Sequence, residues 1–342
     1  MKIGFFTDSY FPGIDGVTYT IKAWKERLEE RGHEVHVVYP GNPGYEPGEN
    51  EHPVKSLPNF FYSQYRLPLY RRISTLPELD VVHCHGAASI GLLGRRYSKK
   101  KDVKSVYTHH TPVEDYLVRG LKSEILANLA GKLWVFYENK MLQEFDCVTA
   151  STSKIDRKVE PHKLPVGLEM DFFKPVETEM FEDGKVIGYS GRMSKKKNLG
   201  EVLKLAKKMP EKKFVLVGEG PERPKLERKA PENVEFRDFL DREELPEFYT
   251  AIDVFVSAST CDTLGLSTLE ANACGTPVAA ADVEPFNRTI QGENGSRFEY
   301  GDIESMKASV QECLDNEIDT RGAVKKYSIE ETVNQLEEIY EG

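Results

Sequence analysis

The segment at residues 191–198, GRMSKKKN, places four cations directly after an apolar stretch, Val186–Ser190, that is predicted to be a strand. Arg192 and Lys197 would then lie at the carboxyl end of that strand, ahead of the helix expected at Leu199–Lys207. Cations placed where negative charge develops stabilise a departing diphosphate. A lysine run is also typical of a solvated surface loop, but the position after a strand favours phosphate chemistry.

Two carboxylates, Asp262 and Glu270, flank a glycine turn that opens a predicted helix. The backbone amides of Gly265 and Leu266 can hold phosphate at the N-terminus of that helix. Glu270 can accept hydrogen bonds from ribose hydroxyls, and Asp262, before the turn, can accept them from a sugar. In the structural alternative, Asp262 and Thr268 cap the helix and Glu270 lies on the surface. The apolar neighbours of Glu270 favour a lined pocket.

Another glycine-rich turn, residues 13–17 (GIDGV), follows the first predicted strand and opens the first predicted helix. Glycines there let the backbone approach a ligand closely, and the helix N-terminus favours a phosphate. The spacing is not that of the dinucleotide-binding G-x-G-x-x-G motif, and an ordinary strand-to-helix turn explains it equally well.

The elements that would position these segments alternate between strands and helices in two series, separated by a turn-rich break at 164–175. Each series predicts a parallel sheet with helices on both faces. Ligands of such sheets bind at the carboxyl ends of the strands, here in a cleft between two domains. The predicted elements are Ile3–Thr7, Val17–Arg31, Glu34–Tyr39, Asp80–His85, Ala87–Tyr97, Val103–Thr108, Lys122–Phe145 and Cys147–Ala150, then Val186–Ser190, Leu199–Lys207, Lys213–Val217, Pro221–Lys229, Val234–Arg237, Glu243–Ala251, Val254–Ser257, Thr268–Ala273 and Pro277–Ala280.

Length and composition fit a soluble two-domain protein. The chain has 342 residues, of which 39% are hydrophobic and 30% are charged, values normal for globular domains. Its net charge of −10 argues against general nucleic-acid binding, which needs a basic face. The five cysteines have no zinc-ligand spacing, which indicates reduced thiols in the cytoplasm. No apolar run approaches the length of a membrane span.

Together these motifs resemble the retaining GT-B glycosyltransferases of family 4 (GT4) over nearly the whole chain. That resemblance implies an α/β fold with two Rossmann-like domains whose parallel sheets face each other across a cleft. It implies an acceptor-binding domain at 1–165, a nucleotide-sugar-binding domain at 166–325, and a C-terminal helix at 326–342 that packs back on the first domain. The motifs that carry it are Phe11-Pro12 through Gly16-Val17, Arg31 to Val35, Gly191-Arg192 with Lys197-Asn198, Val217 to Pro221, and the block Asp262 to Pro277.

Roles for individual residues follow from the same resemblance. The family's basic pair falls on Arg192 and Lys197, and its paired acids, with seven residues between them, fall on Asp262 and Glu270. The first acid is usually Glu, so Asp262 is a departure whose shorter side chain affects contact with the donor sugar. The predicted donor-binding residues are Gly16, the family's phosphate-contacting glycine, with Gly191, Arg192, Lys197, Gly218, Gly265, Leu266 and Glu270.

A narrower resemblance lies in residues 107–111, YTHHT, followed by EDY at 114–116. This stretch is similar to the YTYHT…EDY segment of bacterial diacylglycerol α-glucosyltransferases. The resemblance implies that His110 reaches the donor sugar near its reacting carbon, which makes His110, Arg192, Lys197 and Asp262 the predicted catalytic residues. A lone histidine after a strand is usually structural, and His109 replaces the family's tyrosine, so the details of the acceptor stay open.

One further feature fits a lipid acceptor. Residues 60–104 carry nine Lys and Arg against three acidic residues, a net charge of +6 in a protein of −10. Aromatic and leucine side chains accompany these cations in the first part of the segment. Basic residues beside exposed aromatics suit an anionic membrane surface. A solvated face beside ordinary core residues explains the segment nearly as well.

The predicted function is transfer of a hexose from a nucleotide diphosphate-sugar, UDP-glucose or alternatively GDP-mannose, to a membrane glycerolipid. The resemblance implies retention of configuration, and a front-face mechanism is the working assumption. We expect a cytoplasmic enzyme, peripheral on the inner face of the cell membrane. Because no two aspartates are two residues apart, the D-x-D metal motif is absent, and we expect no metal or cofactor. The alternatives are a soluble acceptor, such as a sugar phosphate or glycan, and a non-catalytic nucleotide-sugar binding protein.

Overall fold

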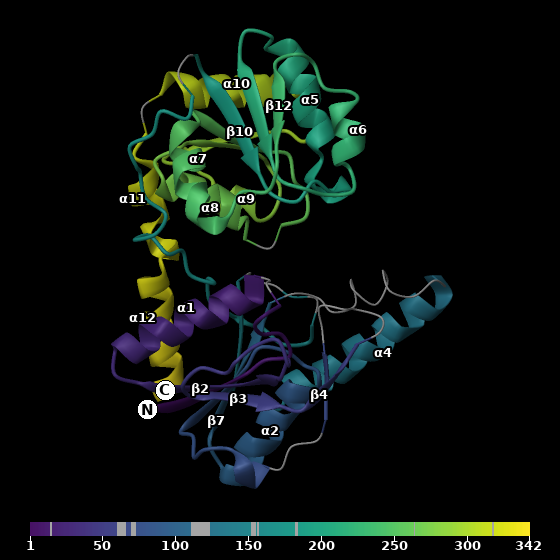
Figure 1. Ribbon diagram of the computed structural model, residues 1–342, viewed down its shortest axis with the longest axis vertical. Coiled ribbons are helices and arrows are strands. Elements are labelled where there is room, and N and C mark those ends of the chain that lie inside the picture. Colours follow the sequence, from purple (N-terminus) through teal and green to yellow (C-terminus); the bar gives the residue numbers. More distant parts are fainter. Residues whose placement is uncertain are drawn as a thin grey trace. The chain divides into compact units, whose positions relative to one another are not determined.

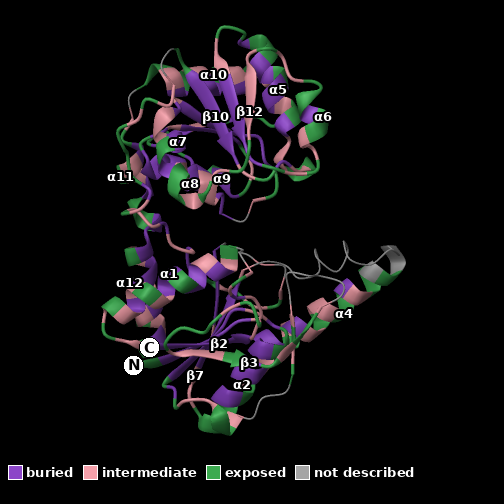
Figure 2. Ribbon diagram, in the orientation of Figure 1, coloured by how far each residue is buried: buried purple, intermediate pink, exposed green. Residues whose placement is uncertain are grey.

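The computed structural model describes residues 1–13, 16–59, 66–69, 73–110, 124–151, 155, 157–181, 184–262, 264–316 and 318–342. The chain divides into two compact units: the first holds Met1–Gly167 with Ile329–Gly342, and the second holds Leu168–Ser328. Each unit is built from alternating strands and helices (Figure 1). In each, the strands form the buried centre (Figure 2).

A seven-stranded parallel sheet forms the centre of the first unit, in the order β3-β2-β1-β6-β7-β8-β9. The edge strand β3 was not predicted, because its sequence, EHPV, is polar and contains a proline, which only an edge strand tolerates. The strands are β1 (Lys2–Phe6), β2 (Glu34–Pro40), β3 (Glu51–Val54), β6 (Val81–Cys84), β7 (Lys104–His109), β8 (Cys147–Ala150) and β9 (His162–Lys163), while β4 (Ser56–Pro58) and β5 (Arg66–Pro68) pair antiparallel beside them.

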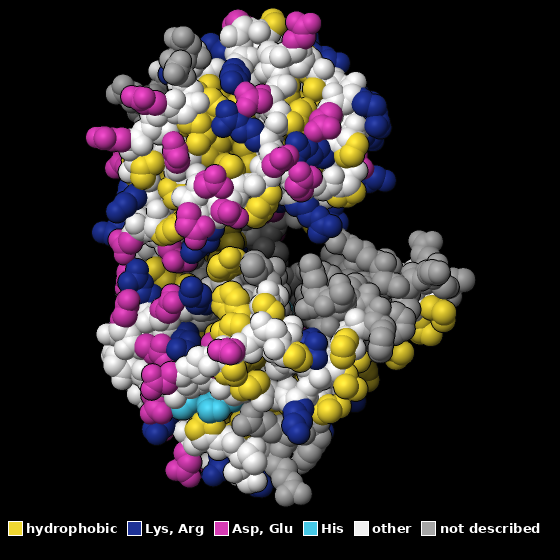
Figure 3. All heavy atoms as spheres, in the orientation of Figure 1, with side chains coloured by type: hydrophobic (Ala, Val, Ile, Leu, Met, Phe, Trp, Pro, Cys, Tyr) yellow, Lys and Arg dark blue, Asp and Glu magenta, His cyan; other side chains and the backbone are white. Residues whose placement is uncertain are grey.

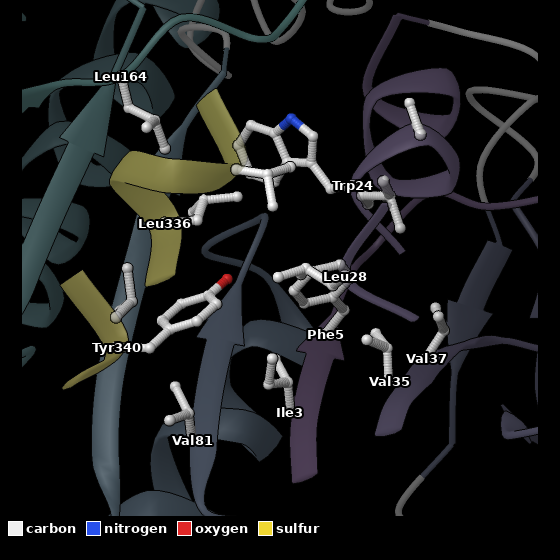
Figure 4. Close-up of a cluster of buried hydrophobic side chains, with 14 of the residues drawn as sticks. Ile3, Phe5, Trp24, Leu28, Val35, Val37, Val81, Leu164, Leu336 and Tyr340 are labelled. Carbon is white, nitrogen blue, oxygen red and sulfur yellow. The ribbon is translucent and has the colours of Figure 1, made fainter. Parts of the chain in front are cut away.

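Helices cover both faces of this sheet because side chains alternate along each strand. Ile3 and Phe5 of β1 pack with α1 (Gly16–Glu30) and α12 (Ile329–Glu341), as Figure 4 shows. Phe6 points to the other face, toward α2 (Ser89–Lys101) and α4 (Glu124–Leu142). Helix α1 and the strand ends therefore hold their loops at one edge of a sheet whose central strands are buried.

The C-terminal helix α12 belongs to the first unit. Its residues Ile329, Val333, Leu336 and Tyr340 recur at helical spacing and are all buried in the same core as α1 (Figure 4). An ion pair of 2.6 Å between Arg31 Nη1 and Glu337 Oε2 joins the end of α1 to this helix. The last residues of the chain thus complete the core that the first residues begin.

The second unit contains a six-stranded parallel sheet in the order β12-β11-β10-β13-β14-β15. Helix α10 packs on β13, β14 and β15 and contacts α5, while α8 packs between β13, β14, α7 and α11. The elements are β10 (Val186–Ser190), η2 (Lys195–Lys197), α5 (Leu199–Lys208), β11 (Lys213–Val217), α6 (Arg223–Glu227), β12 (Val234–Arg237), η3 (Arg242–Glu244), α7 (Leu245–Ala251), β13 (Val254–Ser257), α8 (Leu266–Ala273), β14 (Val278–Ala281), α9 (Phe286–Thr289), β15 (Gly295–Phe298), α10 (Ile303–Asp315), α11 (Thr320–Val324) and η4 (Lys325–Tyr327).

The predicted helix Glu243–Ala251 is divided between η3 and α7. Pro246 lacks a backbone N–H and is accommodated only in the first turn of α7. Ahead of it, Asp241 and Glu244 form a reciprocal capping box that starts η3. Strand β15 and helices α10 and α11 follow the last strand predicted for this unit, Pro277–Ala280, and were not predicted from the sequence.

Candidate functional site

The candidate donor site lies at the carboxyl edge of the second sheet. From β10 the chain runs outward to β11 and β12, then returns to β13 on the other side of β10. Ligands of open α/β sheets bind at such a change of direction, outside the carboxyl ends of the strands. The loop after β10 carries Arg192 and Lys197, and the loop after β13 carries Asp262. The fold therefore brings two of the sequence-predicted segments to one edge.

Glycines allow the loops after β10 and β11 to touch each other. A Cβ on Gly218 would lie 2.2 Å from the carbonyl oxygen of Gly191, and Gly218 adopts a φ of 129°. Beside them, Met193 N donates to Glu219 O at 2.8 Å. Any side chain at position 218 would separate these loops, so Gly191 and Gly218 form one continuous backbone surface.

Lys197 and Asp262 form an ion pair in this site. Lys197 Nζ donates to Asp262 Oδ1 at 2.5 Å, with side-chain exposures of 23% and 19%. Asn198 holds the Lys197 loop in place: it has a left-handed φ of 51°, and its Nδ2 donates to Ala258 O at 3.0 Å, beyond the end of β13. The pair is thus half-buried, fixed by backbone contacts, and reachable by solvent.

Arg192 lies in the same loop but does not join that pair. Its side chain is exposed, and it makes no ion pair within the described part of the chain. Its backbone is held, since the Tyr189 hydroxyl donates to Arg192 O at 3.2 Å. Nearby Asp262 adds to the burial that raises the pKa of Tyr189. The guanidinium is therefore available to an anionic ligand at this edge.

Glu270 lies one turn into α8 and is partly buried. Tyr249 of α7 donates its hydroxyl to Glu270 Oε2 at 2.9 Å. Burial raises the pKa of Glu270 to about 7, against the lowering effects of the Tyr249 hydrogen bond and the Arg242 charge. Tyr249 was not predicted as a site residue, since it lies inside an amphipathic helix and only the packing of α7 against α8 brings it to Glu270.

The structural alternative for this segment does not match the contacts. Among the described residues, no side chain caps the N-terminus of α8, and Asp262 bonds to Lys197 instead. The Thr268 hydroxyl is buried and donates to Gly265 O at 2.6 Å. Gly265 itself has a φ of 74°, and a Cβ there would lie 2.5 Å from Phe286. Gly265 is thus required for the turn that presents the amides at Leu266.

Gly16 begins α1 at the carboxyl edge of the first sheet. A Cβ at this position would meet nothing within 4 Å, so open space adjoins the helix N-terminus here. Thr20 and Thr18 fix the turn by donating to Gly16 O at 2.7 Å and Gly13 O at 3.1 Å. The site can therefore admit an anion close to the backbone.

His110 follows β7 and pairs with His85, which follows β6. His85 Nδ1 and His110 Nε2 are 3.0 Å apart, and the rings stack. Burial, with nearby His83 and His110, holds the pKa of His85 well below the usual range, so His85 is neutral. Its Nε2 is buried without a partner among the described residues. The contact with His85 fixes the orientation of the His110 ring, and the tautomers of the two rings decide which nitrogen donates. His85 was not predicted as a site residue; the one sequence feature that could have indicated it is a polar side chain at the end of the predicted strand Asp80–His85.

Part of the predicted motif set lies outside the described residues. The residues concerned are Asp15, Thr111, Glu114, Asp115, Tyr116 and Thr263, and, in the basic segment, Phe60, Phe61, Tyr62, Tyr65, Tyr70, Arg71 and Arg72.

Among the described residues, no group of three or more His, Cys, Asp or Glu side chains forms a potential metal site. Within the same residues, no helix is both long and apolar enough to cross a membrane.

Comparison with known proteins gives two family matches and several relatives. Residues 171–331 match the family described as glycosyl transferases group 1, and residues 14–165 match glycosyltransferase family 4. Alpha-monoglucosyldiacylglycerol synthase of Acholeplasma laidlawii is 30% identical over 87% of this chain and 85% of its own length. The enzyme of the same name from Streptococcus pneumoniae is 30% identical over 92% and 78%. A GDP-mannose-dependent alpha-mannosyltransferase of Mycolicibacterium smegmatis is 26% identical over 82% and 80%.

Solved structures match the chain over its whole length. Sucrose-phosphate synthase from Thermosynechococcus elongatus has a TM-score of 0.73 at 18% identity, covering 100% of this chain and 98% of that one. Anabaena HepE in complex with UDP and glucose has a TM-score of 0.70 at 17% identity, covering 99% and 98%. At these identities the likeness is one of fold.

Proposed function

Because the chain belongs to glycosyltransferase family 4 and is a hexosyltransferase, we propose that it transfers glucose from UDP-glucose to a membrane glycerolipid with retention of configuration. The GT-B fold predicted from the sequence is confirmed by the two parallel α/β sheets and the solved structures that share them. One observation carries the choice of acceptor: two relatives at 30% identity over most of the chain are named alpha-monoglucosyldiacylglycerol synthases.

In this proposal the second unit binds the nucleotide-sugar. Lys197 and Arg192 contact the diphosphate and stabilise the charge that develops as it leaves. Because Lys197 bonds to Asp262 at 2.5 Å, a diphosphate that attracts Lys197 would free the Asp262 carboxylate for the sugar hydroxyls. Glu270 accepts hydrogen bonds from the ribose. The contacts that support this division are the Lys197–Asp262 ion pair and the Tyr249–Glu270 hydrogen bond.

The first unit binds the acceptor and completes the reaction. The open backbone at Gly16 supports a phosphate contact there, and the orientation of His110 by His85 supports a hydrogen bond between His110 and the donor sugar. No protein nucleophile is assigned, and the acceptor hydroxyl attacks from the face that the diphosphate leaves. Proton transfer from that hydroxyl to the departing phosphate oxygen balances this front-face step.

The acceptor assignment is tested directly by product analysis. The purified protein is incubated with UDP-glucose and diacylglycerol in mixed detergent micelles, and the glycolipid is examined by NMR. We expect an α-linked glucosyl lipid, with UDP-glucose used in preference to GDP-mannose. Matched incubations replace diacylglycerol with sugar phosphates and oligosaccharides. Transfer to these alone would support the soluble-acceptor alternative, and absence of transfer to every acceptor would support a nucleotide-sugar binding protein.

A mannosyl donor is the second candidate. The relative from Mycolicibacterium smegmatis, named a GDP-mannose-dependent alpha-mannosyltransferase, aligns over 82% of the chain. The identity of 26% is below that of the two glucosyl relatives, so glucose is the first choice. The donor panel in the same assay separates the two sugars.

Metal-independent catalysis is part of the proposal. The predicted basic pair takes the place that a divalent ion holds in other phosphate-transfer sites. We expect the initial rate to stay within about twofold of its untreated value after EDTA treatment. The measurement compares rates in EDTA with rates in added Mg²⁺ or Mn²⁺. Complete loss in EDTA, restored by either ion, would contradict this assignment.

Membrane association through residues 60–104 is proposed as well. In the described part of this segment, Arg95 and Lys99 both contact Glu144, and Lys101 lies 3.6 Å from Glu78. Arg96 and Lys100 are exposed and form no ion pair with described residues. These two cations support electrostatic attraction to an anionic surface, which high salt weakens.

A further inference from the structure

Helix α4 exposes a continuous apolar stripe. Leu126, Leu129, Leu133 and Phe136 are 59%, 55%, 61% and 61% exposed, although each is a large hydrophobic residue. Their spacing of three, four and three places them on one helix face, over about 15 Å of its length. Figure 3 shows hydrophobic side chains along the flank of the first unit where α4 runs. A contiguous apolar surface of this kind marks an interaction site.

The opposite face of α4 is firmly anchored. Glu138, 1% exposed, accepts from Arg157 Nε at 2.7 Å and from the Tyr107 hydroxyl at 3.0 Å. Tyr137 donates to Ala87 O at 3.0 Å, and Trp134 packs on the core of this unit. The helix is therefore held by its buried side, and the stripe is not the face by which it folds.

The exposed charged side chains of α4 that the structure describes are lysines. Lys132 and Lys140 are exposed on this side of the helix, and Lys140 Nζ lies 4.6 Å from the centre of the Phe136 ring. Among the α4 side chains that the structure describes, Glu138 is the acidic one, and it is buried. In a protein of net charge −10, a face that combines leucines with lysines, and whose described side chains include no exposed carboxylate, is complementary to an anionic lipid surface.

We propose that this α4 face, defined by Leu126, Leu129, Leu133 and Phe136, docks on an anionic bilayer, with its apolar side chains entering the boundary between headgroups and acyl chains. The inference rests on the proposed lipid acceptor and adds the surface by which the enzyme reaches it. Such a surface binds by buried apolar area together with attraction of lysines to anionic lipid. Residues 60–104 supply charge in that arrangement, whereas α4 supplies the apolar contact.

The test is co-sedimentation of the full chain with phosphatidylcholine vesicles that contain or lack phosphatidylglycerol. The variant Leu129→Gln/Leu133→Gln keeps good helix formers at both positions while removing apolar area. We expect its partition onto anionic vesicles to fall by at least about tenfold. The matched control is Phe239→Gln, which removes another large side chain, 72% exposed, from the second unit. This control should bind as the wild type does.

Transfer to diacylglycerol in detergent micelles is measured in parallel, because it requires no bilayer. We expect the double variant to retain it, so loss of vesicle binding is separated from misfolding. Equal vesicle binding by the double variant and the wild type would overturn the docking surface, as would a wild type that ignores anionic vesicles. A wild-type dimer that the double variant converts to monomer in sedimentation analysis would also overturn it. Failure of micellar transfer by the wild type would instead count against the proposed function.

Discussion

Replacing Lys197 by alanine is expected to lower kcat by about 10²–10³-fold, as is replacing Arg192, since each removes a cation from the departing diphosphate. Lys197 is positioned for this by the Asn198 contact with the chain beyond β13, and Arg192 has no competing ion pair among the described residues. Steady-state rates with UDP-glucose and a lipid acceptor measure both effects. Because the Lys197–Asp262 pair is partly exposed, its loss should change the free energy of unfolding by only about 1 kcal/mol or less.

Lys195 provides the matched control. It is an exposed lysine in the same short helix, η2, and it belongs to neither predicted pair. Lys195→Ala should therefore keep turnover near the wild-type value. If Arg192→Ala and Lys197→Ala also did so, while thermal unfolding showed intact folds, the basic pair would not be the site of leaving-group stabilisation.

Glu270→Ala should weaken UDP binding by about 10- to 100-fold, since hydrogen bonds to a charged group contribute about 1.5–3 kcal/mol. Asp262→Ala should change it much less, because Asp262 is assigned to the sugar, which UDP lacks. Removing Asp262 also releases Lys197 from its ion pair and leaves it free for the diphosphate. Isothermal calorimetry with UDP measures both affinities. Equal losses, or a larger loss in Asp262→Ala, would contradict the division of roles.

The ionisation of Glu270 gives an independent check. Its pKa is raised to about 7, chiefly by burial. Ribose hydroxyls that donate to the carboxylate favour the charged form and lower this pKa. UDP binding should therefore release protons near neutral pH, and affinity should rise as pH increases through 7. Calorimetry in buffers of different ionisation enthalpy detects this release, and Glu270→Gln, which keeps an acceptor for Tyr249, should abolish it.

The sequence by itself determined the repeating elements and the chemistry at their ends. Apolar runs such as Val186–Ser190 and Val254–Ser257 are strands as predicted, because fully buried strands need continuous hydrophobic residues. Helices α1 and α8 begin at Gly16 and Leu266, next to the glycines that the sequence pattern singled out, since local backbone conformation is encoded locally. The resemblance to family 4 added residue roles that no spacing rule supplies, and those roles stay predictions.

Only the tertiary structure decided which side chains meet. Lys197 and Asp262 are 65 residues apart in sequence, and His85 and His110 are 25 apart. Their pairing depends on strand order, with β13 beside β10 and β7 beside β6, and strand order is set by packing of the whole unit. The Tyr249–Glu270 hydrogen bond likewise requires α7 and α8 to pack together.

The exposed face of α4 illustrates the same limit. Its sequence, EILANLAGKLWVFYENKML, is apolar around most of the helix, so the pattern alone does not show which face is buried. Burial of Glu138 against Arg157 and Tyr107 fixes the rotation of the helix and leaves Leu129 and Leu133 outward. Periodicity predicts that a segment is helical, but which side of it stays in contact with water depends on partners that are distant in the sequence.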